Sequence, residues 1–150
     1  MPKIENKWDS LYDPGKQTWF TKLEERAINW YFSRMFGKTI LSVSEIKSGK
    51  IFEPGCGSGM TCAQFAQDGF DITLMDLSPN ALKKALTTFE NFGQSCKFTI
   101  GDLFNLPFPD EEFDVVFNQG VMEHFKIAGI SPDAGIQEML RVVKKGGTLI

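Results

Sequence analysis

A nine-residue segment, Ile51 to Gly59, constrains the fold of this chain more than any other part of its sequence. An apolar run ends there in an acidic residue, Glu53, and glycines then occupy alternate positions, namely Gly55, Gly57 and Gly59. Residues 60–67, which follow, have a helix-like pattern. This order predicts a strand, a tight turn and a helix N-terminus, because glycine permits positive φ and lets a ligand approach the main chain closely.

The spacing of the glycines discriminates between nucleotide-binding turns. A dinucleotide-binding turn has the pattern G-x-G-x-x-G, whose third glycine would fall on Met60 when counted from Gly55, and on Cys62 when counted from Gly57. The Lys and Ser/Thr of a phosphate-binding G-x-x-x-x-G-K-[ST] loop are also missing from the segment. The chain fits acid-x-G-x-G-x-G instead, although a purely structural strand-to-helix turn stays open for this segment taken alone.

Three later apolar runs also end in polar residues. Asp76 ends the second run, and Ser78 and Pro79 follow it as a helix N-cap and first helical residue. Asp102 follows the third run, and the fourth ends in Asn118 and Gln119. Because parallel strands bring their carboxyl ends to one edge of a sheet, this alternating strand–helix order predicts a doubly wound α/β fold with a site at that edge.

Hydrophobic periodicity and turn residues predict the following elements. The expected helices are 18–35, 40–46, 59–68, 79–92 and 133–144. The expected strands are 50–53, 71–75, 96–100, 113–118 and one that begins at 147, after a turn at Gly146-Gly147. Loops are expected over 102–112 and 119–131, the second of them mobile.

The motifs from Lys50 to Ile150 together resemble, in order and spacing, the class I S-adenosylmethionine-dependent methyltransferases. The resemblance implies a Rossmann-like, mostly parallel sheet, S-adenosyl-L-methionine as the cofactor, and methyl transfer to a small-molecule acceptor. It divides the chain into an N-terminal helical lid or cap segment, 1–46, and an S-adenosylmethionine-binding domain, 47–150.

The resemblance also implies which residues bind the cofactor. Those expected near its methionine part and ribose are Glu53, Gly55, Cys56 and Gly57. Asp76, with Leu77 beside it, would hold the ribose hydroxyls, and Asp102 with the Leu103 backbone would face the adenine. Asn118 and Gln119 would line the floor beneath the methionine moiety.

Two residues in Gln119 to Phe125, which resembles the family's exit from its fourth strand, are weak candidates for a general base. These are Glu123 and His124, and a solvated acid and a surface or capping histidine are the alternatives.

The aromatic residues of the N-terminal segment have two interpretations. The amphipathic pattern of the expected helix comprises Trp19, Leu23, Ala27, Trp30, Tyr31 and Met35, and its Trp19, Leu23 and Trp30 stripe is expected to pack on the sheet or cover the core. Alternatively, Trp8, Tyr12 or Trp19 closes over the cofactor.

The composition of the chain limits the binding partners and the cellular location that we expect for it. The net charge is −3 and no long basic block is present, which argues against a nucleic-acid substrate. The sequence has no apolar run of membrane-spanning length and no signal peptide at its start, so we expect no membrane partner and a cytoplasmic protein. Three cysteines without C-x-x-C spacing are expected to be reduced, and a single histidine predicts no metal site.

The chain ends at Ile150, inside what the resemblance implies is the fifth strand, so the sheet is expected to be C-terminally incomplete. An open sheet edge would favour self-association. Two other functions stay open: a nucleotide-dependent oxidoreductase, and a non-catalytic cofactor-binding or scaffold protein.

Overall fold

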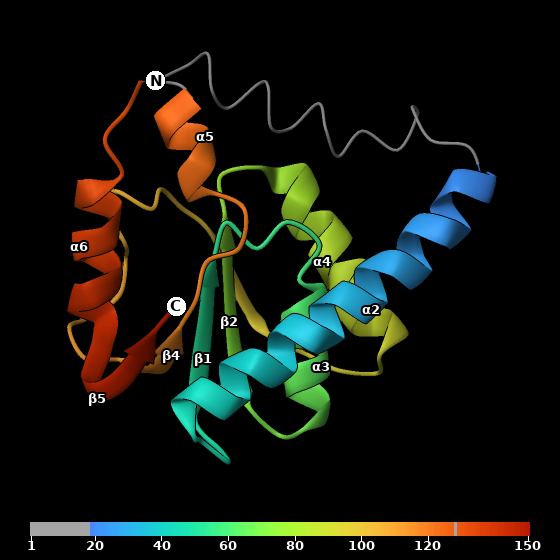
Figure 1. Cartoon of the computed structure of the whole chain (residues 1–150), viewed down its shortest axis with the longest axis horizontal. Coiled ribbons are helices and arrows are strands. Elements are labelled where there is room, and N and C mark those ends of the chain that lie inside the picture. Colours follow the sequence, from blue (N-terminus) through green and yellow to red (C-terminus); the bar gives the residue numbers. More distant parts are fainter. Residues whose placement is uncertain (1–18, 128) are drawn as a thin grey trace.

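The computed structural model, which describes residues 19–127 and 129–150, is built around a five-stranded sheet with the order β3-β2-β1-β4-β5 (Figure 1). All four strand pairs are parallel. The strands are β1 (Lys50–Pro54), β2 (Asp71–Asp76), β3 (Lys97–Ile100), β4 (Phe113–Val116) and β5 (Val143–Leu149). The chain adds β2 and then β3 on one side of β1, and it then returns to add β4 and β5 on the other side. This order confirms the expected doubly wound fold.

Helices cover both faces of this sheet (Figure 1). On one face lie α2 (Trp19–Ser44), α3 (Met60–Gln67) and α4 (Pro79–Asn91), and on the other α5 (Met122–Ile127) and α6 (Asp133–Val142). Ile51 and Phe52 of β1 are fully buried on opposite faces, each in its own hydrophobic cluster. A strand buried on both faces has a continuous apolar run rather than an alternating one, as the sequence of β1 does.

The N-terminal part of the fold differs from the expectation of two helices, because α2 is one continuous helix. Its buried face holds Gly37 and Ile40, and a Cβ on Gly37 would lie 3.2 Å from Cε1 of Phe65 in α3. The absent side chain thus lets α2 approach α3 closely without breaking the helix.

The expected packing of the stripe is wrong for Trp30, which is exposed, and Ala27, Tyr31 and Met35 of the same amphipathic pattern are exposed as well. The physical reason is that contact with α3 selects a different face of α2. The Trp19 and Leu23 side chains lie outside what the structure describes, and Trp8 and Tyr12 belong to the part of the chain before it.

The residues that were predicted to begin and end helix α4 are confirmed. The Ser78 hydroxyl accepts a hydrogen bond from the Ala81 N–H at 3.1 Å, and Pro79 is the first helical residue. Gly93 follows the helix with φ 64°, a conformation that favours glycine.

The expected end of α6 was two residues too late, and Gly146-Gly147 do not form a turn between helix and strand. Instead β5 starts at Val143, and its register against β4 shifts between the pairs Phe113–Val143 and Val115–Thr148. The intervening residues form a bulge, with Gly146 at φ 78°. Beyond it the expected parallel pairing of residues 148–150 with β4 is confirmed.

The expected loop 119–131 contains a short helix, α5. Phe125 in this helix is buried against the second hydrophobic cluster, which explains why the segment is ordered as a helix. Among the described residues, no helix is both long and apolar enough to span a membrane.

Candidate cofactor site

The glycine turn after β1 is tied to the end of β2. The N–H groups of Gly55 and Cys56 donate to the Met75 carbonyl at 2.7 and 3.1 Å. Gly55, Gly57 and Gly59 have φ values of 70°, 53° and 61°, which confirms that the alternate glycines are needed for the backbone path. A Cβ on Gly55 would collide with Cγ2 of Val121, so the segment before α5 lies directly over the turn.

Asp76, at the end of β2, holds the same turn through its side chain. Its Oδ2 accepts a hydrogen bond from the Gly57 N–H at 3.0 Å, and its Oδ1 accepts one from the Ser78 N–H at 2.9 Å. Burial raises the pKa of Asp76, and these backbone hydrogen bonds oppose the rise. The carboxylate therefore has a fixed orientation at the edge of the sheet.

Glu53 is the most deeply buried acid of the site, with 4% of its surface exposed. The Cys62 thiol of α3 donates a hydrogen bond to its carboxyl group. Its Oε2 atom has no hydrogen-bond partner among the described residues. Burial raises the pKa of Glu53 to about 8, the nearby charge of Asp76 adds to the rise, and the Cys62 hydrogen bond opposes it. Without a ligand, Glu53 is therefore mostly protonated at neutral pH.

Asn118 lies beside Glu53, one strand along the sheet. Its Nδ2 donates to the Pro54 carbonyl at 2.6 Å, which fixes the orientation of the amide. Its buried Oδ1, like Oε2 of Glu53, lacks a partner within the described part of the chain. Two buried side-chain oxygens near Pro54 thus lack a partner among the described residues, and each is costly while unpaired. Gln119, the other residue expected here, is exposed.

Asp102 and Leu103 follow β3 at the same edge. Oδ1 of Asp102 accepts a hydrogen bond from the Phe104 N–H at 3.0 Å, and the preceding Gly101 N–H donates to the Asp76 carbonyl at 3.2 Å. The Leu103 side chain is buried against α6, where a Cβ on Gly135 would lie 3.1 Å from its Cγ. Leu103 therefore offers its main chain, rather than its side chain, to a ligand.

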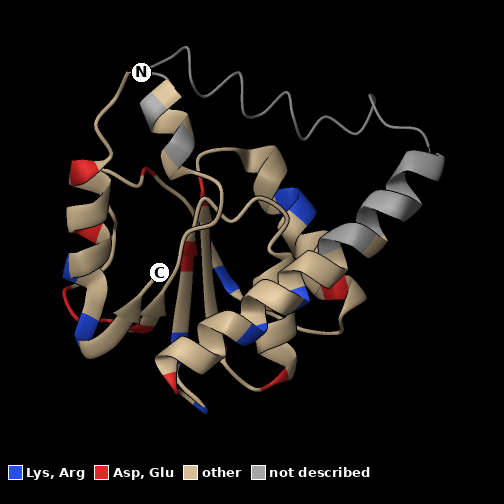
Figure 2. Cartoon of the chain, viewed as in Figure 1, with Lys and Arg blue, Asp and Glu red and all other residues tan. Residues whose placement is uncertain are grey.

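Figure 2 shows the acidic residues in red, some toward the carboxyl ends of the central strands and others at their amino ends and on the helices. Those expected to bind the cofactor are Glu53, Asp76 and Asp102, and the hydrogen bonds described above bring Asp76 into contact with the turn that follows Glu53. Such an edge suits a ligand that carries positive charge and hydroxyl groups.

The remaining candidates are less tightly placed. Cys56 is buried, which raises the pKa of its thiol, so this side chain fills space within the turn instead of acting as a thiolate. Leu77 is half-buried between Asp76 and the N-cap of α4. His124 is half-buried on α5, and its main-chain N–H donates a hydrogen bond to the Val121 carbonyl. The Glu123 side chain lies outside what the structure describes.

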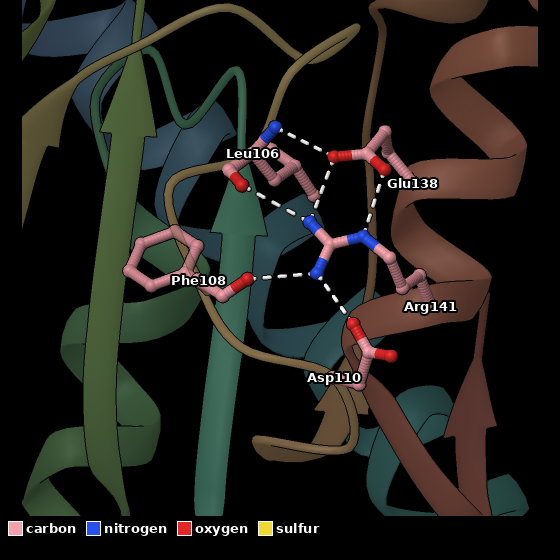
Figure 3. A network of polar contacts seen from close by, with 5 residues as sticks. All are labelled: Leu106, Phe108, Asp110, Glu138 and Arg141. Carbon is pink, nitrogen blue, oxygen red and sulfur yellow. Dashed lines mark hydrogen bonds and ion pairs between the residues drawn. The ribbon is translucent and has the colours of Figure 1, made fainter.

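Sequence reasoning missed two groups next to this site. Val121 covers Gly55, and Arg141 of α6 holds the segment that follows Asp102 and Leu103 (Figure 3). The i, i+3 spacing of Glu138 and Arg141 was visible in the sequence, but the loop atoms that they bind lie some thirty residues earlier in the chain.

The chain is similar in sequence to known methyltransferases. The family model described as "Methyltransferase domain" matches residues 52–150. The 2-methyl-6-phytyl-1,4-hydroquinone methyltransferase of Synechocystis sp. is 36% identical over 103 residues, which cover 67% of this chain and 30% of that protein. The norajmaline N-methyltransferase of Rauvolfia serpentina is 27% identical over 145 residues, which cover 95% of this chain and 48% of that protein.

The fold is also found in solved structures. The crystal structure of a Methanococcus maripaludis protein described as a "putative s-adenosyl-l-methionine-dependent methyltransferase" superimposes with a TM-score of 0.72 at 19% identity, covering 86% of this chain and 59% of that one. The chain spans less than half the length of the two sequence relatives above. On the match of the family model to residues 52–150, this chain belongs to the class I S-adenosylmethionine-dependent methyltransferase family.

Proposed function

We propose that this chain binds S-adenosylmethionine at the carboxyl edge of its sheet and takes part in methyl transfer to a small-molecule acceptor. The observation that carries the proposal is the pair of buried oxygen atoms without a partner among the described residues, Glu53 Oε2 and Asn118 Oδ1, beside the glycine turn. The names of the hydroquinone and norajmaline methyltransferases support a small molecule as the acceptor.

The residues present fit this cofactor. Glu53 and Asn118 would accept hydrogen bonds from its α-ammonium group, and the acidic edge would suit its positive charge. Asp76 is oriented to accept hydrogen bonds from ribose hydroxyls, and the Gly55–Gly57 main chain allows close approach. Asp102 and the Leu103 main chain are assigned to the adenine.

When bound, the cofactor supplies a methyl group on a sulfonium, whose leaving group is a neutral thioether. The protein has to hold the donor in line with the acceptor and keep water out. Val121 and α5 lie over the glycine turn, where they can help to exclude water. A base is required only for an acceptor that must lose a proton, and Glu123 and His124 stay candidates for that role.

Calorimetric titration of the protein with S-adenosylmethionine, S-adenosylhomocysteine and NAD tests the binding part of the proposal. We expect the first two to bind and NAD not to bind. Binding of NAD alone would favour an oxidoreductase and refute the proposal.

A matched pair of variants on β2 locates the site. Asp76→Ala should weaken cofactor binding by about 1.5–3 kcal/mol, the range for a hydrogen bond to a charged group. Asp71→Ala is the control, because Asp71 starts the same strand at the opposite edge, where it forms an exposed ion pair with Lys97 at 2.8 Å. Equal effects of the two substitutions would show that the cofactor lies elsewhere.

Transfer is tested separately from binding. The protein is incubated with methyl-labelled cofactor and with pools of small phenols and amines, and with a protein extract as the competing acceptor class. Label in the small-molecule fraction is the expected result. Cofactor binding without transfer to any acceptor would favour the non-catalytic binding protein.

A further inference from the structure

The guanidinium group of Arg141 joins α6 to the loop between β3 and β4 (Figure 3). Nε donates to Glu138 Oε1 at 2.8 Å, and Nη2 donates to Glu138 Oε2 at 2.8 Å and to the Leu106 carbonyl at 3.0 Å. Nη1 donates to the Phe108 carbonyl at 2.8 Å and to Asp110 Oδ1 at 2.9 Å. A guanidinium has five N–H donors, and these contacts use all five.

Glu138 completes the connection from the acceptor side. Its Oε2 also accepts a hydrogen bond from the Leu106 N–H at 2.8 Å, so both main-chain polar groups of Leu106 are bound to α6. The hydrogen bond from Arg141 holds the pKa of Glu138 below its usual range, and Glu138 in turn raises the pKa of Arg141. Both side chains are therefore charged at neutral pH.

The same loop begins with the residues assigned to the adenine. Leu103 packs against Gly135, one turn before Glu138 on α6, and Asp102 is braced by the Phe104 N–H. Helix α6 thus holds the loop at its start, through Gly135, and again from Leu106 to Asp110, through Arg141. Few residues separate these two attachments to α6, so the loop between them has little freedom to shift while both contacts are in place.

We propose that Arg141 is a positioning residue that holds Asp102 and Leu103 in register with the adenine base, and so sets the selectivity of the site for adenine. The inference rests on the proposed function. Hydrogen-bond recognition of a base edge depends steeply on geometry, so a loosened loop loses discrimination between bases before it loses the rest of the cofactor. Lysine cannot replace arginine here, because only the planar fork reaches two carboxylates and two main-chain carbonyls at once.

The main variant is Arg141→Lys, which keeps the charge. The matched control is Lys144→Gln, which breaks the 2.7 Å ion pair to Asp114 near the amino end of β4, at the opposite edge of the sheet from Asp102 and Leu103. Asp110→Asn is a milder second variant at a mostly exposed acceptor of the same guanidinium, for use if Arg141→Lys does not fold.

Each protein is titrated with S-adenosylhomocysteine and with S-inosylhomocysteine, in which an oxygen replaces the amino group of the base. We expect the wild type to prefer the adenine ligand. Arg141→Lys should lower the affinity for S-adenosylhomocysteine about tenfold, the equivalent of about one ligand hydrogen bond, and lower the affinity for S-inosylhomocysteine much less. Asp110→Asn should move the ratio in the same direction by a smaller factor, and Lys144→Gln should leave it unchanged.

Hydrogen exchange gives a readout without ligand. The amides of residues 104–108 should exchange faster in Arg141→Lys than in the wild type, and not in Lys144→Gln. Unchanged exchange, an unchanged ligand ratio in Arg141→Lys, or a wild type that does not prefer adenine would overturn the inference while leaving the proposed function in place. A wild type that binds neither ligand would instead refute the proposed function itself.

Discussion

Replacement of Glu53 by Gln should stabilise the ligand-free protein by an amount that grows with pH. Glu53 is 4% exposed, and burial raises its pKa to about 8. In the folded protein its carboxyl group therefore keeps its proton well above the pH at which an unfolded chain releases it. Gln has nearly the same shape as the protonated acid and does not titrate, so it avoids the cost of a buried charge.

The sign and size follow from the two pKa values. Between the ordinary value of 4.5 and the folded value of about 8, the folded state holds one more proton than the unfolded state, so stability falls as pH rises. The slope is at most about 1.4 kcal/mol per pH unit. Between pH 5.5 and pH 8.5 the wild type should thus lose about 3 kcal/mol through Glu53, and Glu53→Gln should not.

Urea unfolding at pH 5.5, 7.0 and 8.5, without cofactor, measures the difference between the two proteins. Other titrating groups are common to both proteins and cancel in the difference. Asp114→Asn is the control: burial acts to raise the pKa of Asp114, but hydrogen bonds from Lys144 and Lys50 lower it overall, so its titration ends below this range. That variant should be less stable than the wild type by an amount that does not change with pH. A pH-independent difference for Glu53→Gln would refute the reasoning.

Three further predictions concern the glycine turn and the sheet edge. Gly57→Val should abolish cofactor binding, because a β-branched residue is strained at φ 53°, and calorimetry showing retained affinity would place the ligand elsewhere. Gly59→Ala should lower the free energy of unfolding by about 1–3 kcal/mol, since its Cβ would lie 3.1 Å from Leu74 and 3.2 Å from Ala85 at φ 61°; an unchanged urea midpoint would contradict this. The 150-residue chain should self-associate through β5, which is one of the two edge strands of the described sheet and is followed by the partly exposed Ile150. A strictly monomeric protein across a concentration series in sedimentation would count against it.

Local signals in the sequence were sufficient for most of the fold. The alternate glycines, the apolar run at Ile51 and Phe52, and the Ser78 N-cap depend on backbone conformation or near neighbours, and all three predictions are confirmed. The edge of the sheet at which polar residues gather could be predicted as well, because parallel strands joined by crossover helices leave their carboxyl ends on one side.

Other properties depend on segments that are distant in the sequence. The buried face of α2 is selected by its contact with α3, and the bulge in β5 by its pairing with β4, so periodicity and glycines alone predicted both incorrectly. The raised pKa of Glu53 comes from complete burial, which no residue type reports by itself. Three hydrogen bonds of Arg141, to the Leu106 and Phe108 carbonyls and to Asp110, join α6 to a loop that precedes it by some thirty residues.

The sequence by itself determined the order of strands and helices and the chemical types at the strand ends, because these depend on residues close together in the chain. The tertiary structure decided which of those groups are buried and which atoms are left without partners. It also decided which side chains hold the loop between β3 and β4. These depend on the removal of water and on contacts between elements far apart in the chain.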